Sequence, residues 1–153
     1  MGGLAIYISC LIVSIFTLKM DVKMLGLLLG ATFIVIMGII DDIKPLKPLT
    51  KLLVQISAAC ILLLYDINIK TISLPFIGHD RYFNIGYFGI ILTVLWVVGI
   101  TNAMNLIDGL DGLACGTGII ASITLFIISL ITKRYMSAIM TITLAGSSLG
   151  FVL

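Results

Sequence analysis

Charged residues are scarce in this chain. Of its 153 residues 10% are charged and 61% are hydrophobic, whereas a soluble domain carries about 25% charged residues. The composition therefore excludes a soluble globular domain and predicts that the lipid bilayer is the solvent. A net charge of +2 is too small to indicate binding to nucleic acid.

Histidine and cysteine are also rare. The single histidine, His79, fits no metal-ligand spacing. The three cysteines lie in separate apolar runs, which indicates small buried hydrophobic residues rather than a disulfide framework. No basic residue precedes the first apolar run and no small-residue cleavage site follows it, so we expect no secretory signal.

Long apolar runs, in contrast, fill most of the chain. Six can be marked, at residues 4–18, 24–40, 50–65, 87–105, 113–132 and 135–153. A spanning helix needs about 20 residues, with about 17 as a lower limit, so the last three runs are long enough and the first three are short. We predict an all-α polytopic membrane protein with about six transmembrane helices in a single transmembrane domain, residues 1–153.

The connections and the glycines add local predictions. Residues 66–86 alternate apolar and polar side chains on both sides of a Gly78 turn, which predicts a small β-hairpin at one membrane face. Pro45 and Pro48 indicate a helix end followed by a helix start. Two small-xxx-small patterns allow close helix packing. They are Gly26 with Gly30 and Gly146 with Gly150.

The polar residues in the second half of the chain are concentrated in one segment. Two asparagines and two aspartates recur there every third residue, at Asn102, Asn105, Asp108 and Asp111. On a helix they would form a slowly winding stripe about 13–14 Å long, enough to line a nucleotide-sugar diphosphate. Gly109 and Gly112 would let a ligand or another helix approach the backbone.

A second polar cluster lies upstream, at the end of another apolar run. Asp41 and Asp42 are adjacent, so on a helix they point about 100° apart. Both can serve one site only if the helix ends there. Lys51 and Gln55 share one face of the following helix, where a lysine would offset phosphate charge. Since paired carboxylates suit Mg²⁺ and its bound phosphates, the two clusters together predict a metal-and-phosphate site at one membrane surface.

Each cluster taken alone has a plainer interpretation. An aspartate pair at a helix end is often a solvated terminus, and Lys44, Lys47 and Lys51 could contact lipid headgroups. Asn102 and Asn105 could join helices by hydrogen bonds. Asp108 and Asp111, between apolar runs and beside glycines, favour function most clearly.

Counting the membrane crossings places both carboxylate clusters on the same side and the hairpin on the other. Three lysines accompany the carboxylates, whereas six basic residues lie on the hairpin side. These six are Lys19, Lys23, Lys70, Arg81, Lys133 and Arg134. The positive-inside rule therefore favours carboxylates that face out of the cell.

The polar motifs resemble those of a known family. Asn102-x-x-Asn105-x-x-Asp108-Gly-Leu-Asp111-Gly-Leu-Ala closely resembles the signature of the polyprenyl-phosphate N-acetylhexosamine-1-phosphate transferases, glycosyltransferase family 4. Gly38-Ile-Ile-Asp41-Asp42 and Lys51-x-x-x-Gln55 resemble a second motif of this family. The motifs occur in the same order along the whole chain. Their sequence is most similar to that of the bacterial branch that transfers GlcNAc-1-phosphate to undecaprenyl phosphate.

The resemblance implies a function and a set of site residues. A sugar 1-phosphate would pass from a UDP-sugar to undecaprenyl phosphate with release of UMP, aided by Mg²⁺ or Mn²⁺. The protein would be a multi-pass protein of the cell membrane, with its active-site loops in the cytosol and the hairpin outside it. The resemblance implies no binding of nucleic acid and is compatible with an oligomer. The candidate catalytic residues and metal ligands are Asp41, Asp42, Asp108 and Asp111. The candidate substrate-binding residues are Lys51, Gln55, Asn102, Asn105, Gly109 and Gly112.

The same resemblance predicts that the chain is an internal part of a longer enzyme. Met1-Gly2-Gly3 resembles the tail of the family's Pro-x-x-Gly-Gly motif. Three alternatives stay open: a phospho-N-acetylmuramoyl-pentapeptide transferase, a membrane transporter, and an inactive truncated scaffold. A transporter predicts carboxylates near the middle of the bilayer, whereas these carboxylates lie at the ends of apolar runs.

Overall fold

The computed structural model describes residues 2–73, 82–108 and 112–152. In chain order its described elements are α1 (Gly2–Thr17), α2 (Val22–Ile43), α3 (Pro48–Leu64), β1 (Thr71–Ser73), β2 (Tyr82–Asn84), α4 (Phe88–Ile107), α5 (Leu113–Ile131) and α6 (Tyr135–Val152). The architecture is that of an all-α polytopic membrane protein with one small sheet, as the apolar runs predict.

Four of the described helices are long and apolar enough to cross a membrane: α2, α4, α5 and α6. The apolar helices α1 and α3 are shorter, with 16 and 17 residues. The prediction that the second run is also short is wrong, because α2 has 22 residues. The Asp21 carboxylate caps its start by accepting a 2.7 Å hydrogen bond from the Met24 N–H, and its other end extends through Asp41 and Asp42.

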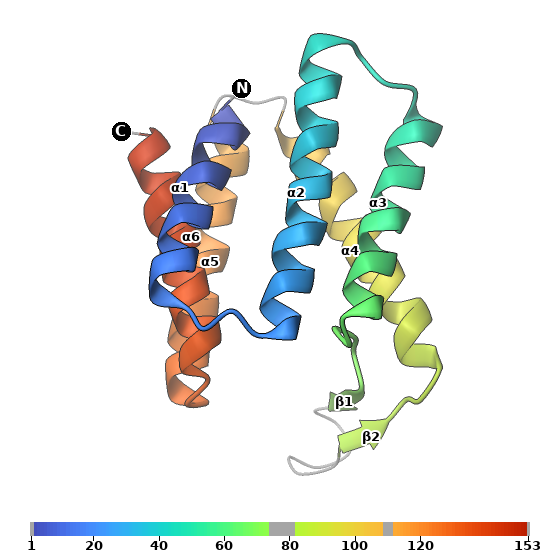
Figure 1. The fold of residues 1–153 in the computed structure, drawn as a ribbon, viewed down its shortest axis with the longest axis vertical. Helices are drawn as coiled ribbons and strands as arrows, with labels where there is room; N and C mark the ends of the chain where they lie inside the picture. Colours follow the sequence, from blue (N-terminus) through green and yellow to red (C-terminus); the bar gives the residue numbers. More distant parts are fainter. Residues whose placement is uncertain (1, 74–81, 109–111, 153) are drawn as a thin grey trace.

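The helices form two groups of three (Figure 1). In one group α6 packs against α5 and α1, and in the other α3 packs against α2 and α4. Sparser contacts between α1 and α2 and between α4 and α5 join the groups. The two strands lie at one end of the bundle, whereas the α2–α3 connection lies at the opposite end.

Small residues occupy the interior and large aliphatic residues cover the outside. The buried apolar residues include Ala58, Ala59, Ala138 and Ala145. On the outside, Leu64 is 84% exposed. This distribution is typical of helices that pack through small residues in lipid. Most threonine hydroxyls in the described helices donate to a carbonyl one turn back in their own helix, so they need no partner from the lipid.

The predicted hairpin is confirmed as a pair of antiparallel strands, and its predicted turn at Gly78 lies outside the described residues. Ile72 pairs with Phe83 at the centre of the register. The chain just before β1 is fixed to α4, since the Ile69 N–H donates to the Thr93 hydroxyl (3.0 Å) and that hydroxyl donates to the Gly89 carbonyl (2.6 Å). A side chain at Gly89 would collide with the Ile69 carbonyl oxygen, so this contact requires glycine.

Candidate functional site

The first part of the site is the connection between α2 and α3. The helix α2 ends at Ile43, two residues before Pro45, and α3 begins at Pro48, whose missing N–H costs nothing in a first turn. The helix break that would let both aspartates serve one site is therefore present just beyond them.

The Asp41 carboxylate holds this connection together. Its Oδ2 accepts a 2.6 Å ion-paired hydrogen bond from Lys51 Nζ, and its Oδ1 accepts a 2.8 Å bond from the Leu46 N–H. Both charged side chains are less than one third exposed. The sequence analysis missed Leu46, because a backbone N–H has no residue-type signature. The flanking prolines are a usable signal, since they leave Leu46 and Lys47 as the N–H donors between them.

The helix α3 links this pair to α4. Gln55 lies one turn after Lys51 and has no exposed surface. Its Nε2 donates to Asn102 Oδ1 at 3.2 Å, and its Oε1 accepts from Asn102 Nδ2 at 2.9 Å. Of the predicted site residues, the structure thus brings Asp41, Lys51, Gln55 and Asn102 into one line across three helices.

The polar stripe ends earlier than predicted. Asn102 and Asn105 lie one turn apart on exposed parts of α4, but the helix stops at Ile107 with Asp108 as its C-cap residue. Gly112 is the N-cap residue of α5 and has φ +75°, a left-handed conformation that interrupts a regular helix and that glycine adopts at little cost. A continuous helical stripe of about 13–14 Å is therefore wrong. Gly109 and Asp111 lie outside the described residues.

The described carboxylates of the candidate site lie at the C-terminal ends of helices. Asp41 and Asp42 lie in the last turn of α2, and Asp108 caps α4. The C-terminus of a helix carries a partial negative charge, so an anion there typically costs about 0.3–1 kcal/mol. No basic residue lies in the last turn of either helix to offset this cost. Asp41 pairs instead with Lys51 of the following helix, and a bound cation would offset the charge of Asp108 at the end of α4.

The grouping of these carboxylates is loose within the described residues. Asp41 and Asp108 are joined by no hydrogen bond or ion pair there, and no three His, Cys, Asp or Glu side chains of the described chain converge on one point. The donors are nevertheless hard oxygen atoms, and Mg²⁺ commonly takes one or two carboxylates together with substrate phosphates and water. The donor set therefore fits Mg²⁺ better than a softer metal.

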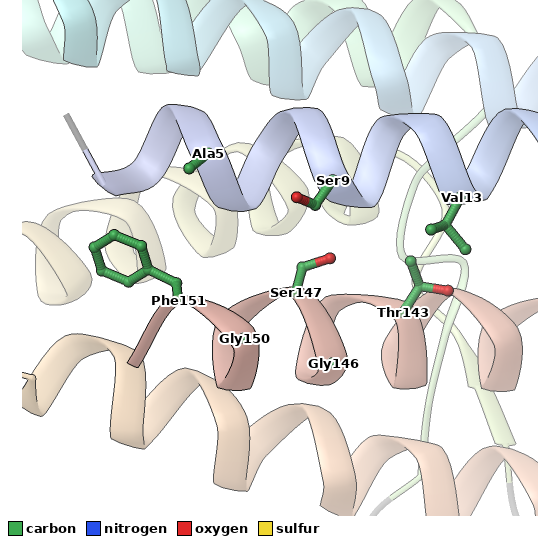
Figure 2. Close-up of a pocket in the computed structure, with 8 residues that line it drawn as sticks. All are labelled: Ala5, Ser9, Val13, Thr143, Gly146, Ser147, Gly150 and Phe151. Carbon is green, nitrogen blue, oxygen red and sulfur yellow. The ribbon is translucent and has the colours of Figure 1, made fainter. Parts of the chain in front are cut away.

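Two cavities lie in the described part of the bundle. The larger, about 490 Å³, opens between α1 and α6, where Ser9, Thr143 and Ser147 face the gap (Figure 2). No carboxylate lines it. The smaller, about 210 Å³, lies between α2 and α3 and is bordered by Ile40, next to Asp41, and Thr50, next to Lys51. The smaller cavity is therefore the one that adjoins the acidic cluster.

The order of motifs, the helix ends and the acidic cluster agree with a known family. The model of glycosyl transferase family 4 matches residues 24–153. The chain belongs to this family. No solved structure matches the chain, so the geometry above is read from this structure alone.

Curated members of glycosyl transferase family 4 align with nearly the whole chain. A probable undecaprenyl-phosphate N-acetylglucosaminyl 1-phosphate transferase of Bacillus subtilis is 36% identical over 99% of this chain and 42% of its own length. A decaprenyl-phosphate N-acetylglucosaminephosphotransferase of Mycobacterium leprae is 32% identical over the same shares. A phospho-N-acetylmuramoyl-pentapeptide-transferase of Halalkalibacterium halodurans is 35% identical over 99% of this chain and 51% of its own length. The chain thus spans about half or less of these relatives.

Proposed function

We propose that the protein transfers a sugar 1-phosphate from a UDP-sugar to a polyprenyl phosphate and releases UMP. The observation that carries the proposal is that three carboxylates and a lysine lie at helix ends on one side of an apolar bundle (Figure 1): Asp41 and Asp42 in the last turn of α2, Lys51 in the first turn of α3 and Asp108 at the end of α4. Such a site suits a reaction between two phosphate groups at a membrane surface, and the two first-mentioned relatives are named for it.

The apolar cavity between α2 and α3 supports a lipid acceptor. Its lining is almost entirely apolar and comprises Phe33, Ile36, Met37, Ile40, Leu46, Thr50 and Val54. One end of this lining reaches Leu46 and Thr50, the chain neighbours of the groups that bind Asp41. A polyprenyl chain seated there would bring its phosphate close to Lys51 at the membrane surface.

The chemistry needs positioning and charge neutralisation more than proton transfer. A phosphate monoester has a second pKa near 6, so the attacking lipid phosphate is largely dianionic at pH 7. Its oxygen attacks the sugar-side phosphorus of the donor, and the bond to the UMP oxygen breaks. Lys51, with one of its three N–H groups on Asp41, keeps two for phosphate oxygens. Asp41, Asp42, Asp108 and Asp111 would hold Mg²⁺, which when bound supplies neutralising charge to the phosphates.

The sugar is proposed to be GlcNAc, after the names of the first two relatives. The relative named for phospho-N-acetylmuramoyl-pentapeptide is almost as similar, which makes that donor the second candidate. A cytosolic position of the carboxylate loops follows from the proposed substrate, because UDP-sugars are made in the cytosol. This position opposes the bias of the basic residues, so sidedness needs its own test.

The decisive assay uses the complete gene product that contains these residues, purified in detergent with undecaprenyl phosphate and Mg²⁺. UDP-GlcNAc is expected to release UMP and to label the lipid, with no release when the lipid is omitted. UDP-MurNAc-pentapeptide, supplied in a parallel reaction, identifies the alternative donor. Release of UMP from neither donor, by a protein that is folded and monodisperse, would contradict the proposal.

Cysteine labelling tests the proposed orientation. Lys47→Cys and Ser73→Cys, each made in a protein without the three native cysteines, mark the α2–α3 connection and the hairpin, and both positions are exposed. A membrane-impermeant maleimide added to intact cells is expected to label position 73 and not position 47. The reverse pattern would place the carboxylates outside, as the positive-inside rule favours.

A further inference from the structure

We propose that Gln55 is a positioning residue: its buried amide fixes the Asn102 amide and the axial position of α4 relative to Lys51 and Asp41. The inference rests on the proposed function and deepens it. It gives Gln55 a role different from the direct substrate contact that the family resemblance implies.

The two amides form a closed reciprocal pair. One bond runs from Gln55 Nε2 to Asn102 Oδ1 (3.2 Å) and the other from Asn102 Nδ2 to Gln55 Oε1 (2.9 Å). A primary amide has two N–H donors and two oxygen lone pairs, and the pair uses one of each on both residues. Two antiparallel bonds between planar groups fix distance and orientation together, whereas a single bond would leave the amides free to rotate about it.

Burial separates the roles of the two residues. Gln55 has no exposed surface, so a substrate cannot reach its amide while the pair is formed. Asn102 is exposed and retains one N–H and one oxygen lone pair. The pair therefore leaves Asn102 as the side chain that can meet a ligand and makes Gln55 the group that holds it.

The position of the pair along the helices gives it influence over the rest of the site. Lys51 lies one turn before Gln55 on α3 and bonds Asp41 of α2. On α4, Asn105 and the cap residue Asp108 follow Asn102 at successive turns. The helix α3 thus carries one polar link to α2 and one to α4. A slip of α4 along α3 would change the position of Asp108 relative to Lys51, and the amide pair opposes that slip.

The test uses four variants of the pair and one control variant of the complete gene product, purified and assayed at saturating Mg²⁺. Gln55→Leu removes both bonds with little change in volume. Gln55→Asn shortens one side chain of the pair by one methylene, and Asn102→Gln lengthens the other by one. The double variant combines the two changes, so the summed length of the two side chains equals that of the unmodified pair. Ser57→Ala is the matched control on α3, because the Ser57 hydroxyl is exposed and bonds only its own helix, at the Leu53 carbonyl.

For Gln55→Leu we expect kcat to fall about 10- to 100-fold, since a displacement of about 1 Å can cost that much, while KM for both substrates stays within about twofold. The exchanged double variant is expected to recover kcat relative to both single variants, because the pair is restored. Thermal unfolding in detergent, measured on each variant, separates a misplaced site from an unfolded protein.

Three outcomes overturn the inference while leaving the proposed function intact. Gln55→Leu with unchanged kcat would show a merely structural pair. A rise in KM without a fall in kcat would show substrate contact by Gln55. Failure of the exchanged variant to recover, with normal unfolding, would show that each amide acts separately. Absence of transfer by the unmodified protein, in contrast, overturns the proposed function itself and with it any role of Gln55 in transfer.

Discussion

Two glycine pairs with the same spacing pack in opposite ways. A side chain at Gly26 of α2 would collide with Cβ and Cγ of Tyr65, and one at Gly30 would lie 3.2 Å from Leu62 of α3. A side chain at Gly146 or Gly150 of α6 would meet nothing within 4 Å, and both glycines border the cavity between α1 and α6. The close packing that this spacing allows occurs at the first pair and not at the second.

The two groups of helices differ in the same way. Around α3, close glycine contacts accompany an ion pair to α2 and an amide pair to α4. Between α1 and α6, hydroxyl groups face an open cavity of about 490 Å³ (Figure 2). The close glycine contacts lie in the first half of α2, whereas Asp41 and Asp42 lie in its last turn, so the acidic cluster is held by the polar links of α3 and not by these glycines. The small-xxx-small spacing alone does not distinguish the two environments, because it says nothing about the neighbouring helix.

The largest expected contrast is in activity. Asp108→Asn in the complete gene product should lower kcat at least about 10²-fold, because it removes charge that stabilises the transition state. Its stability should be equal or slightly higher, since the change removes an anion from the C-terminus of α4. Ser147→Ala, in the open α1–α6 cavity, is the matched change and should leave kcat within about twofold. Comparable losses in both variants would remove the functional distinction between the two groups.

The second contrast is in stability. Gly26→Ala should destabilise the fold by about 1–3 kcal/mol, because Tyr65 Cβ is tied to the backbone and the end of α3 must shift. Gly146→Ala should stabilise it by about 0.5–1 kcal/mol, since alanine favours the helix and the cavity has room. Unfolding in mixed micelles measures both. Effects of the same sign would show that the α1–α6 cavity is closed in the membrane.

A third contrast concerns two turns, one in each group. Asp66 after α3 and Lys133 after α5 both have φ +57°. Lys133→Gly should stabilise the fold by about 1 kcal/mol, because a left-handed conformation disfavours a lysine side chain. Asp66→Gly should gain less, since aspartate tolerates this conformation and its ion pairs with Lys70 and Lys23 would be lost. Lys133→Ala, which keeps the penalty, is the control in the same unfolding assay.

Local features of the fold were predictable from the sequence and distant contacts were not. Pro45 and Pro48 predicted where α2 ends and α3 begins, and alternation predicted the hairpin, because both depend on neighbouring residues. The acidic cluster was predicted as a set of residues, but its contacts were not. The Gln55–Asn102 pair joins residues 47 apart, and its formation depends on how α3 and α4 cross. The end of α4 at Ile107 was missed, because the every-third-residue pattern was taken as one continuous helix through Asp111.

The smallest expected effect is a pH dependence at the turn after α3. The hydrogen bond from Lys70, together with the Lys70 and Lys23 charges, holds the pKa of Asp66 below its ordinary value of 3.8. The folded state therefore binds fewer protons than the unfolded state near that pH, so the stabilisation is present at neutral pH and is lost as the pH falls through the lowered pKa. Asp66→Asn, which tolerates φ +57°, should be slightly less stable than the unmodified protein at pH 7, and the difference should disappear as the pH falls below 3.8 and through the lowered pKa of Asp66. Because the carboxylate is 60% exposed, 1 M salt should remove most of the difference at pH 7. A difference that persists at low pH or in high salt would show that Asp66 acts through the turn conformation and not through its ion pairs.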